Sequence, residues 1–212
     1  MTIYLDGHTL KFEVENICRM FFPFEKVEIA YGTPVQENYI YTHSSDTEEG
    51  RLLTAKVSYN SQLVEDSMLL AGARHSKSDI EFAFASLLFP MLEQCTGIRP
   101  AWGLLTGIRP VKLLRQMAQE KGLLQAAECL RNDWKVSDKK VKLALETEAH
   151  ESKVLNLSAP KSYSLYLSIP FCPSRCKYCS FVSHSIEMAQ KLLPQYLELM
   201  CKELEHTAKL AK

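Results

Sequence analysis

The sequence predicts an α+β N-terminal domain over residues 1–156, a turn-rich linker at 157–162, and a separate strand–loop–helix unit over 163–212. Three observations lead to this prediction. Residues 1–60 are strand-rich, with short alternating runs of apolar and polar side chains, and residues 76–152 repeat apolar side chains at helical intervals. The third observation is a loop near the end of the chain that holds three of its seven cysteines. Strands followed by helices are typical of the α+β class.

Strands are expected in the first part of the chain at residues 2–6, 9–14, 26–31, 39–43 and 52–59. Gly7 and His8 are expected to form the turn before the second of these runs. Residues 15–22 could continue that strand or open a short helix, because so short a run fits both periods. We expect a small antiparallel sheet, with the acidic segment between residues 43 and 52 as a loop.

Helices are expected in the second part of this domain, the first of them capped by Ser78 and ending near Cys95–Gly97. A five-residue sequence, T-G-I-R-P, then occurs twice, at 96–100 and 106–110. The second copy leads into a helix in which Pro110 occupies the first turn and Gly122 is the stop signal. Two further helices are expected at 123–130 and 137–152.

The composition excludes several classes of protein. Apolar residues make up 46% and charged residues 24%, which is ordinary for a globular chain, and the formal net charge is zero. A neutral chain offers no electrostatic case for binding nucleic acid. No apolar run is long enough for a membrane span, and the first residues do not resemble a signal peptide. We therefore expect a cytoplasmic protein. Its cysteines are odd in number and three of them are clustered, which suits metal ligation better than disulfide bonds.

The last unit carries the most specific pattern in the chain. An apolar strand at 164–169 is expected to lead into a loop that Pro170 and Pro173 keep extended, and residues 186–212 read as one long helix whose apolar stripe includes Tyr196. The loop spaces its cysteines as C-x3-C-x2-C, at Cys172, Cys176 and Cys179.

The chemistry of three thiolates limits what this loop could bind. Thiolates select zinc, copper(I) or iron–sulfur clusters. A structural zinc site needs four ligands, commonly as two C-x2-C pairs, and no second pair is present. Three thiolates on a cubane [4Fe–4S] cluster would leave one iron open for a small chelating ligand, so the spacing favours a cluster over structural zinc.

This motif, with Tyr178 just before the last cysteine, resembles the signature of radical S-adenosylmethionine enzymes. Its flanking residues, Tyr166-x-x-x-Pro170-Phe171-Cys172, resemble the oxygen-independent coproporphyrinogen III oxidase family (coproporphyrinogen dehydrogenase). The segment W-G-L-L-T-G-I-R-P-V-K-L-L at 102–114 resembles the HemZ-like branch of that family, which carries such a segment in an extra N-terminal domain.

The resemblance implies that residues 163–212 are the first β/α unit of a radical S-adenosylmethionine partial (β/α) barrel. Its cofactors would be a [4Fe–4S] cluster and S-adenosyl-L-methionine. The implied reaction is the oxidative decarboxylation of coproporphyrinogen III to protoporphyrinogen IX in haem biosynthesis, through a 5′-deoxyadenosyl radical. A tetrapyrrole would be the substrate, and a flavodoxin or ferredoxin would be the electron donor. The resemblance assigns the cluster to Cys172, Cys176 and Cys179, and cofactor binding to Tyr166, Tyr178 and Phe181.

Two residues depart from the pattern of the oxidases, which usually carry histidine at the position of Ser168 and a fourth cysteine at that of Phe181. Phenylalanine there is also the pattern of relatives that resemble haem chaperones, so a haem-binding protein without oxidase activity is one alternative. A structural zinc module that mediates interactions is another. The glycine-rich strand end that holds the methionine amine is expected after the first helix. The chain ends before it, so we expect an inactive N-terminal fragment.

Several residues outside the loop allow two interpretations. Arg99 and Arg109 each precede a proline at an expected helix start, where they could hold an anion or simply pair with a local carboxylate. His184 could be an auxiliary ligand or a solvent-facing loop residue. The remaining cysteines have apolar neighbours and are expected in the core, namely Cys18, Cys95, Cys129 and Cys201.

Overall fold

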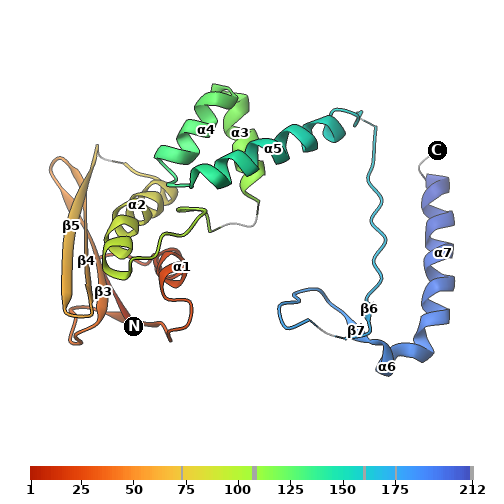
Figure 1. The fold of residues 1–212 in the computed structure, drawn as a ribbon, viewed down its shortest axis with the longest axis horizontal. Coiled ribbons are helices and arrows are strands. Elements are labelled where there is room, and N and C mark those ends of the chain that lie inside the picture. The colour runs from red at the N-terminus through yellow and green to blue at the C-terminus, as the bar shows by residue number, and fades with distance from the viewer. Residues whose placement is uncertain (73, 107–108, 160, 175, 211–212) are drawn as a thin grey trace. The chain divides into compact units, whose positions relative to one another are not determined.

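The computed structural model describes residues 1–72, 74–106, 109–159, 161–174 and 176–210. The chain separates into two compact units, Met1–Leu157 and Ser158–Lys212 (Figure 1). In the described ranges, no helix is both long and apolar enough to cross a membrane.

The first unit is built on one five-stranded sheet of mixed direction, in the order β2-β1-β3-β4-β5. β1 runs parallel to both of its neighbours, and β4 runs antiparallel to both β3 and β5. The prediction of a wholly antiparallel sheet is therefore wrong for the half that contains β1. The strands are β1 (Thr2–Asp6), β2 (Glu28–Tyr31), β3 (Tyr39–Thr47), β4 (Gly50–Tyr59) and β5 (Gln62–Ala71).

A helix, α1 (Lys11–Phe21), explains why β1 and β2 are parallel, because a parallel pair needs a crossover connection. The strand expected at 9–14 is wrong, and of the two readings of residues 15–22 the helix is confirmed. The buried residues of α1 follow the helical interval of three and four, so they form one apolar stripe. They are Val14, Ile17, Cys18 and Phe21.

In the antiparallel half of the sheet, the structure differs from the prediction at two places. The acidic segment expected as a loop between 43 and 52 forms the ends of β3 and β4, whose register closes at Thr47 and Gly50. β5 was not predicted, because Glu65, Asp66 and Ser67 interrupt its apolar residues, and none of its residues is buried. Asn60 and Ser61 form the turn before β5, with φ of 50° and 64°, the left-handed conformation that suits a two-residue hairpin turn.

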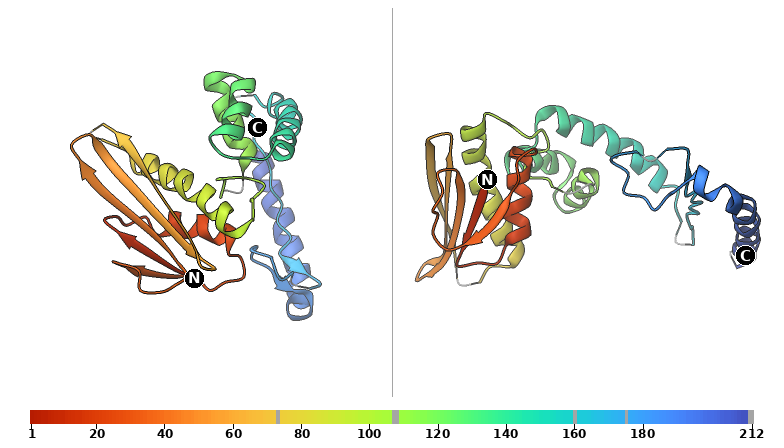
Figure 2. Two further views of the ribbon diagram at one scale, coloured as in Figure 1. Left: turned by 60° about the vertical axis from the view of Figure 1, so that its left-hand side comes forward. Right: turned by 90° about the horizontal axis from the view of Figure 1, so that it is seen from below.

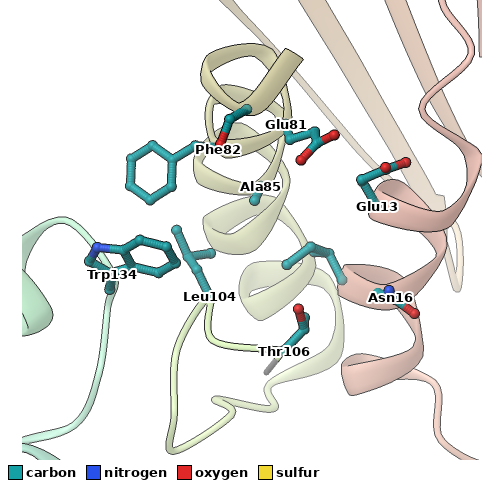
Figure 3. A pocket seen from close by; sticks show the side chains of 10 residues that line it. Glu13, Asn16, Glu81, Phe82, Ala85, Leu104, Thr106 and Trp134 are labelled. Carbon is teal, nitrogen blue, oxygen red and sulfur yellow. The ribbon is translucent and has the colours of Figure 1, made fainter. Parts of the chain in front are cut away.

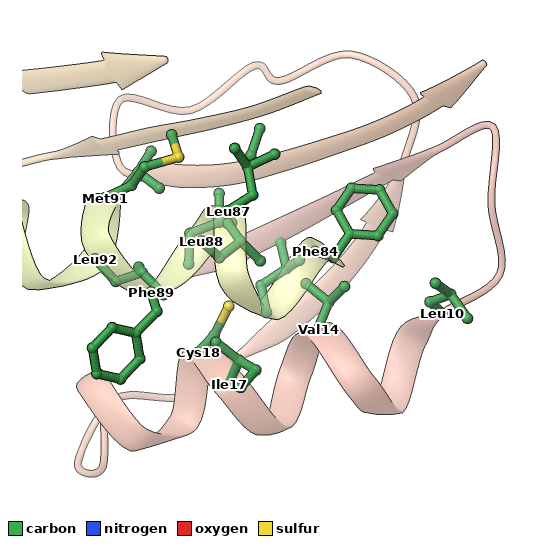
Figure 4. Packing of buried hydrophobic residues seen from close by; sticks show 14 of the residues in the cluster. Leu10, Val14, Ile17, Cys18, Phe84, Leu87, Leu88, Phe89, Met91 and Leu92 are labelled. Carbon is green, nitrogen blue, oxygen red and sulfur yellow. The ribbon is translucent and has the colours of Figure 1, made fainter. Parts of the chain in front are cut away.

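The long helix α2 (Lys77–Thr96) lies beside α1 on one face of the sheet (Figure 2). Ser76 caps it, not Ser78 as expected, and the reciprocal bonds between Ser76 and Asp79 form a capping box. The predicted end is confirmed, since Gly97 takes the left-handed conformation with φ 69°. Side chains of α1 and α2, including Val14, Cys18 and Leu88, meet above the strands in the main core (Figure 4).

Three helices form a second, smaller core within the same unit: α3 (Pro110–Lys121), α4 (Leu123–Asn132) and α5 (Asp138–Leu155). The predicted roles of Pro110 at the start and Gly122 at the end of α3 are confirmed. Trp134 packs against both cores and therefore joins them. The buried members of this core are Leu114, Met117, Ala126, Ala127, Leu130, Val136, Val141 and Ala144.

In the second unit, neither the expected strand nor the expected single helix forms as predicted. Residues 164–169 form no strand, and a two-residue strand, β6 (Phe171–Cys172), pairs instead with β7 (His184–Ser185). The expected helix at 186–212 is divided into α6 (Ile186–Ala189), a 3₁₀ turn (Gln190–Leu192) and α7 (Leu193–Leu210). Pro194 accounts for the break, because its ring and missing N–H prevent an α-helical bond to the residue four positions earlier.

Candidate functional site

The cysteine loop of the second unit is closed by the short β6–β7 pair. Cys172 belongs to β6, and the register places it opposite Ser185 of β7. The His184 backbone N–H donates to the Pro170 carbonyl oxygen at 2.8 Å, which fixes the two ends of the loop together. Inside the loop, the Cys179 N–H donates to the Cys176 carbonyl oxygen at 3.1 Å and forms a tight turn.

All three loop cysteines are free thiols. Cys176 is exposed, and Cys172 and Cys179 are half-buried, so reagents and ions in solution can reach the loop. Within the described part of the chain, no three or more His, Cys, Asp or Glu side chains are gathered as a metal-ion site. The donor set suits a soft metal or an iron–sulfur cluster, but the three thiols would have to converge to bind it.

The three aromatic residues assigned to cofactor binding are exposed. The exposed fractions are 81% for Tyr166, 90% for Tyr178 and 73% for Phe181. None of them lines a described cavity. The three rings therefore lie on or near the loop, but they do not line a shared pocket among the described cavities.

One residue beside the loop was recognised from the sequence only as part of the apolar stripe. Tyr196 of α7 donates a hydrogen bond from its hydroxyl to the Ser168 carbonyl oxygen. Its ring also packs edge-on against Phe171, with the ring centroids 5.1 Å apart. Tyr196 thus connects the long helix to the segment that enters the cysteine loop.

The second unit leaves much of its apolar surface in contact with solvent. α7 contains no buried residue, and Ala189 is the sole buried apolar residue in the described part of this unit. Apolar area left in water costs free energy that burial would recover. The largest exposed side chains near the loop and on α7 include Val182, Met188, Leu192, Leu197, Leu199 and Leu210.

The structure decides between the two interpretations of Arg99. Arg99 donates to both carboxylate oxygens of Glu93, at 2.8 and 2.9 Å, so the local ion pair is confirmed there. Arg109 is exposed just before α3, and the described contacts include no carboxylate partner for it. His184 has an exposed side chain, as the solvent-facing interpretation predicts.

The cysteines outside the loop differ in their environments. Cys18 is fully buried in the main core, and burial raises the pKa of its thiol, so it stays protonated. Cys95 and Cys129 are half-buried at the edges of the two cores. The expectation of a core position is wrong for Cys201, which is exposed on α7.

Across most of its length the chain is similar to a known protein. The chain is 29% identical, over 185 residues, to the oxygen-independent coproporphyrinogen-III oxidase-like protein HemZ of Bacillus subtilis (strain 168). The match covers 82% of this chain but 36% of the relative, so the chain corresponds to about a third of that protein. No model of a known protein family matches the chain. The chain is therefore a distant relative of HemZ.

Proposed function

We propose that this chain carries the cluster-binding loop of a radical S-adenosylmethionine oxidoreductase that acts on a tetrapyrrole in the cytoplasm. The observation that supports this most strongly is a loop of three free cysteines, spaced C-x3-C-x2-C, in a chain similar to a coproporphyrinogen-III oxidase-like protein. The proposed reaction is the oxidative decarboxylation of coproporphyrinogen III, with a flavodoxin or ferredoxin as the electron donor.

Cys172, Cys176 and Cys179 would hold a [4Fe–4S] cluster as thiolates. When bound, such a cluster with S-adenosylmethionine supplies the one-electron chemistry that starts a radical reaction. The chain contributes a loop whose ends are already joined by the β6–β7 pair and by the bond from His184 to Pro170. Because the ends are fixed, only the residues between them need to reorganise for the thiols to converge, which lowers the entropic cost of binding.

The proposed role of the aromatic residues follows from their place beside the thiols. Tyr178 precedes Cys179 directly, and Phe181 lies two residues after it. Both rings are exposed, so they are available to pack against a bound nucleoside and to exclude water from it. Tyr166 would lie near the cluster, on the segment that Tyr196 ties to α7 through Ser168.

Anaerobic reconstitution with iron and sulfide tests the assignment of the three thiols. We expect about four irons per chain, as a cubane cluster requires, and a large loss of iron in Cys172→Ala, Cys176→Ala and Cys179→Ala. Cys201→Ala is the matched control, because Cys201 is also exposed but lies outside the loop. Equal iron in Cys176→Ala and Cys201→Ala would contradict the assignment, and zinc uptake without iron uptake would favour a structural zinc site.

A haem-binding protein without oxidase activity is the second candidate. The observation that favours it is Phe181, an exposed aromatic residue at the position where the oxidases usually carry a fourth cysteine. Titration with haem would separate the candidates. Stoichiometric haem binding by the protein, without decarboxylation of coproporphyrinogen III, would support the haem-binding protein and overturn the oxidase proposal.

A further inference from the structure

Three cavities surround Trp134 in the first unit, where the two cores meet. Their volumes are about 190, 510 and 700 Å³, and Trp134 lines all of them. Figure 3 shows the smallest, in which the Trp134 indole lies beside Leu104 and near Phe82, across from the carboxylates of Glu13 and Glu81. This region belongs to the first unit, whereas the cysteine loop belongs to the second.

The cavity of about 510 Å³ has the size of a small-molecule site and an unusual lining. Apart from Thr106, its walls are apolar except for one cation, Arg109. The lining residues are Leu104, Leu105, Thr106, Arg109, Pro110, Leu113 and Trp134.

Arg109 differs from most arginines of the chain in its partners. Five other arginines pair with a carboxylate, namely Arg19, Arg51, Arg99, Arg115 and Arg131. Among the contacts that the structure describes, Arg109 pairs with none, although Arg99 occupies the same place in the first T-G-I-R-P copy and binds Glu93. The second copy therefore lines the cavity with an arginine that has no carboxylate partner among the described contacts.

We propose that this cavity binds a small apolar molecule that carries one carboxylate. A guanidinium can bind a carboxylate through two parallel hydrogen bonds, and the indole and leucine side chains would cover the apolar body. The ligand should carry only one anionic group. Glu13 and Glu81 line the adjoining cavity, and their carboxylates would repel a second negative charge. Lys77 neutralises part of that charge by pairing with both. The apolar walls disfavour a strongly hydrated ligand such as a sugar phosphate.

The third cavity gives the apolar body room to extend. It shares Leu113 and Trp134 with the Arg109 cavity and is otherwise lined by both apolar and charged side chains. The apolar ones include Phe82 and Met117, and the charged ones are Asp79, Glu120, Lys121 and Asp133. A ligand with its carboxylate at Arg109 could therefore continue along Trp134 toward α2 and α3.

Energy transfer from Trp134 to 1-pyrenebutyrate, a planar apolar carboxylate, tests the proposal in the full chain. Trp102→Phe leaves Trp134 as the single tryptophan, since the chain has two. We expect saturable transfer in this protein and at least a roughly tenfold weaker affinity after Arg109→Gln, the size expected for a lost charged hydrogen bond. Arg109→Lys should retain part of the affinity.

Two controls make the outcome decisive. Arg74→Gln should leave binding unchanged, because Arg74 is exposed and does not line this cavity. Pyrenebutanol, which lacks the carboxylate, should bind the single-tryptophan protein equally well with and without the Arg109→Gln substitution. It should also bind more weakly than pyrenebutyrate does before that substitution. Equal affinity for both probes before substitution, or equal effects of Arg109→Gln and Arg74→Gln, would overturn the proposal.

Discussion

The hydroxyl of Tyr196 donates to the backbone carbonyl of Ser168, 28 residues earlier in the chain. The same ring packs edge-on against Phe171, which directly precedes the first loop cysteine. One side chain of α7 therefore supports the entry to the cysteine loop twice, through a hydrogen bond and through an aromatic contact.

This relationship predicts that Tyr196→Ala weakens iron retention by the reconstituted loop. The variant loses the bond to Ser168 and an aromatic pair that contributes about 0.5–1.5 kcal/mol. Tyr196→Phe keeps the ring and should lie between the alanine variant and the wild type. Iron content after gel filtration is the measurement, and Leu199→Ala, on the same helix, is the control. Unchanged iron in Tyr196→Ala would show that α7 does not support the loop.

His8 predicts a pH dependence for the stability of the first unit. Its ring packs against Phe84 with centroids 4.6 Å apart, and its Nε2 lies 3.0 Å from the Thr42 Oγ1. Burial lowers the pKa of His8 below its ordinary value of 6.5, although the Thr42 carbonyl acts in the opposite direction. The unfolded chain therefore binds this proton first, so the free energy of unfolding should fall as the pH drops below about 6.5.

Urea unfolding between about pH 5 and pH 8 would measure this dependence. His8→Asn should reduce the slope, because the titrating group is removed. His150→Asn is the matched control, since His150 is exposed on α5. A slope that is the same in both variants would contradict the role of His8.

Adding one methyl group at Gly103, where the two cores meet, should strongly reduce the stability of the first unit. Gly103 has φ 57°, and a Cβ atom there would lie 2.0 Å from the Trp134 carbonyl oxygen. Gly103→Ala should therefore lower the free energy of unfolding by more than about 2 kcal/mol. Gly97→Ala is the control, because Gly97 has φ 69° with open space around it and should cost about 1 kcal/mol. Chemical denaturation measures the free energy of unfolding of both variants. Equal losses in Gly103→Ala and Gly97→Ala would argue against the contact with Trp134.

The hairpin turn between β4 and β5 predicts a stabilising substitution. Ser61 has φ 64°, a conformation that glycine adopts without strain. Ser61→Gly should raise the free energy of unfolding by about 0.5–1 kcal/mol, after allowing for the greater freedom of glycine in the unfolded chain. Ser58→Gly, within β4, should instead destabilise. A loss of stability in Ser61→Gly would show that the turn differs from this geometry.

The distribution of buried residues predicts the course of limited proteolysis. Both apolar clusters lie in the first unit, whereas α7 has no buried residue. Trypsin should therefore cut first in the second unit, at sites such as Lys161 and Lys177, and leave a resistant fragment close to residues 1–157. Mass spectrometry identifies the fragments. A resistant fragment that begins near residue 158 would contradict this expectation.

The sequence was most informative where structure depends on local chemistry. Pro110 and Gly122 delimit α3 as predicted, because proline and glycine restrict or free the backbone wherever they occur. The parallel pairing of β1 with β3 joins Thr2 to Tyr39 and depends on distant partners that the alternation pattern does not specify. The apolar run at 164–169 illustrates the same limit, since strand propensity forms a strand only where a partner is available.

In the candidate site, too, the sequence reveals the local pattern, whereas contacts between distant residues depend on the fold. The spacing of Cys172, Cys176 and Cys179 can be read directly from the sequence, and their assignment to a cluster stays a prediction. The contact between Tyr196 and Ser168 could not be predicted, because it depends on how α7 folds back toward the loop. Arg99 and Arg109 have the same local sequence, and only the fold shows that Glu93 pairs with Arg99.

Electron paramagnetic resonance of the anaerobically reconstituted, reduced protein, with and without S-adenosylmethionine, tests the central proposal most directly. We expect the signal of a reduced [4Fe–4S] cluster that is absent in Cys176→Ala, unchanged in Cys201→Ala and altered when S-adenosylmethionine is added. A cluster signal that persists in Cys176→Ala, or the failure of the wild-type loop to form any cluster, would contradict it.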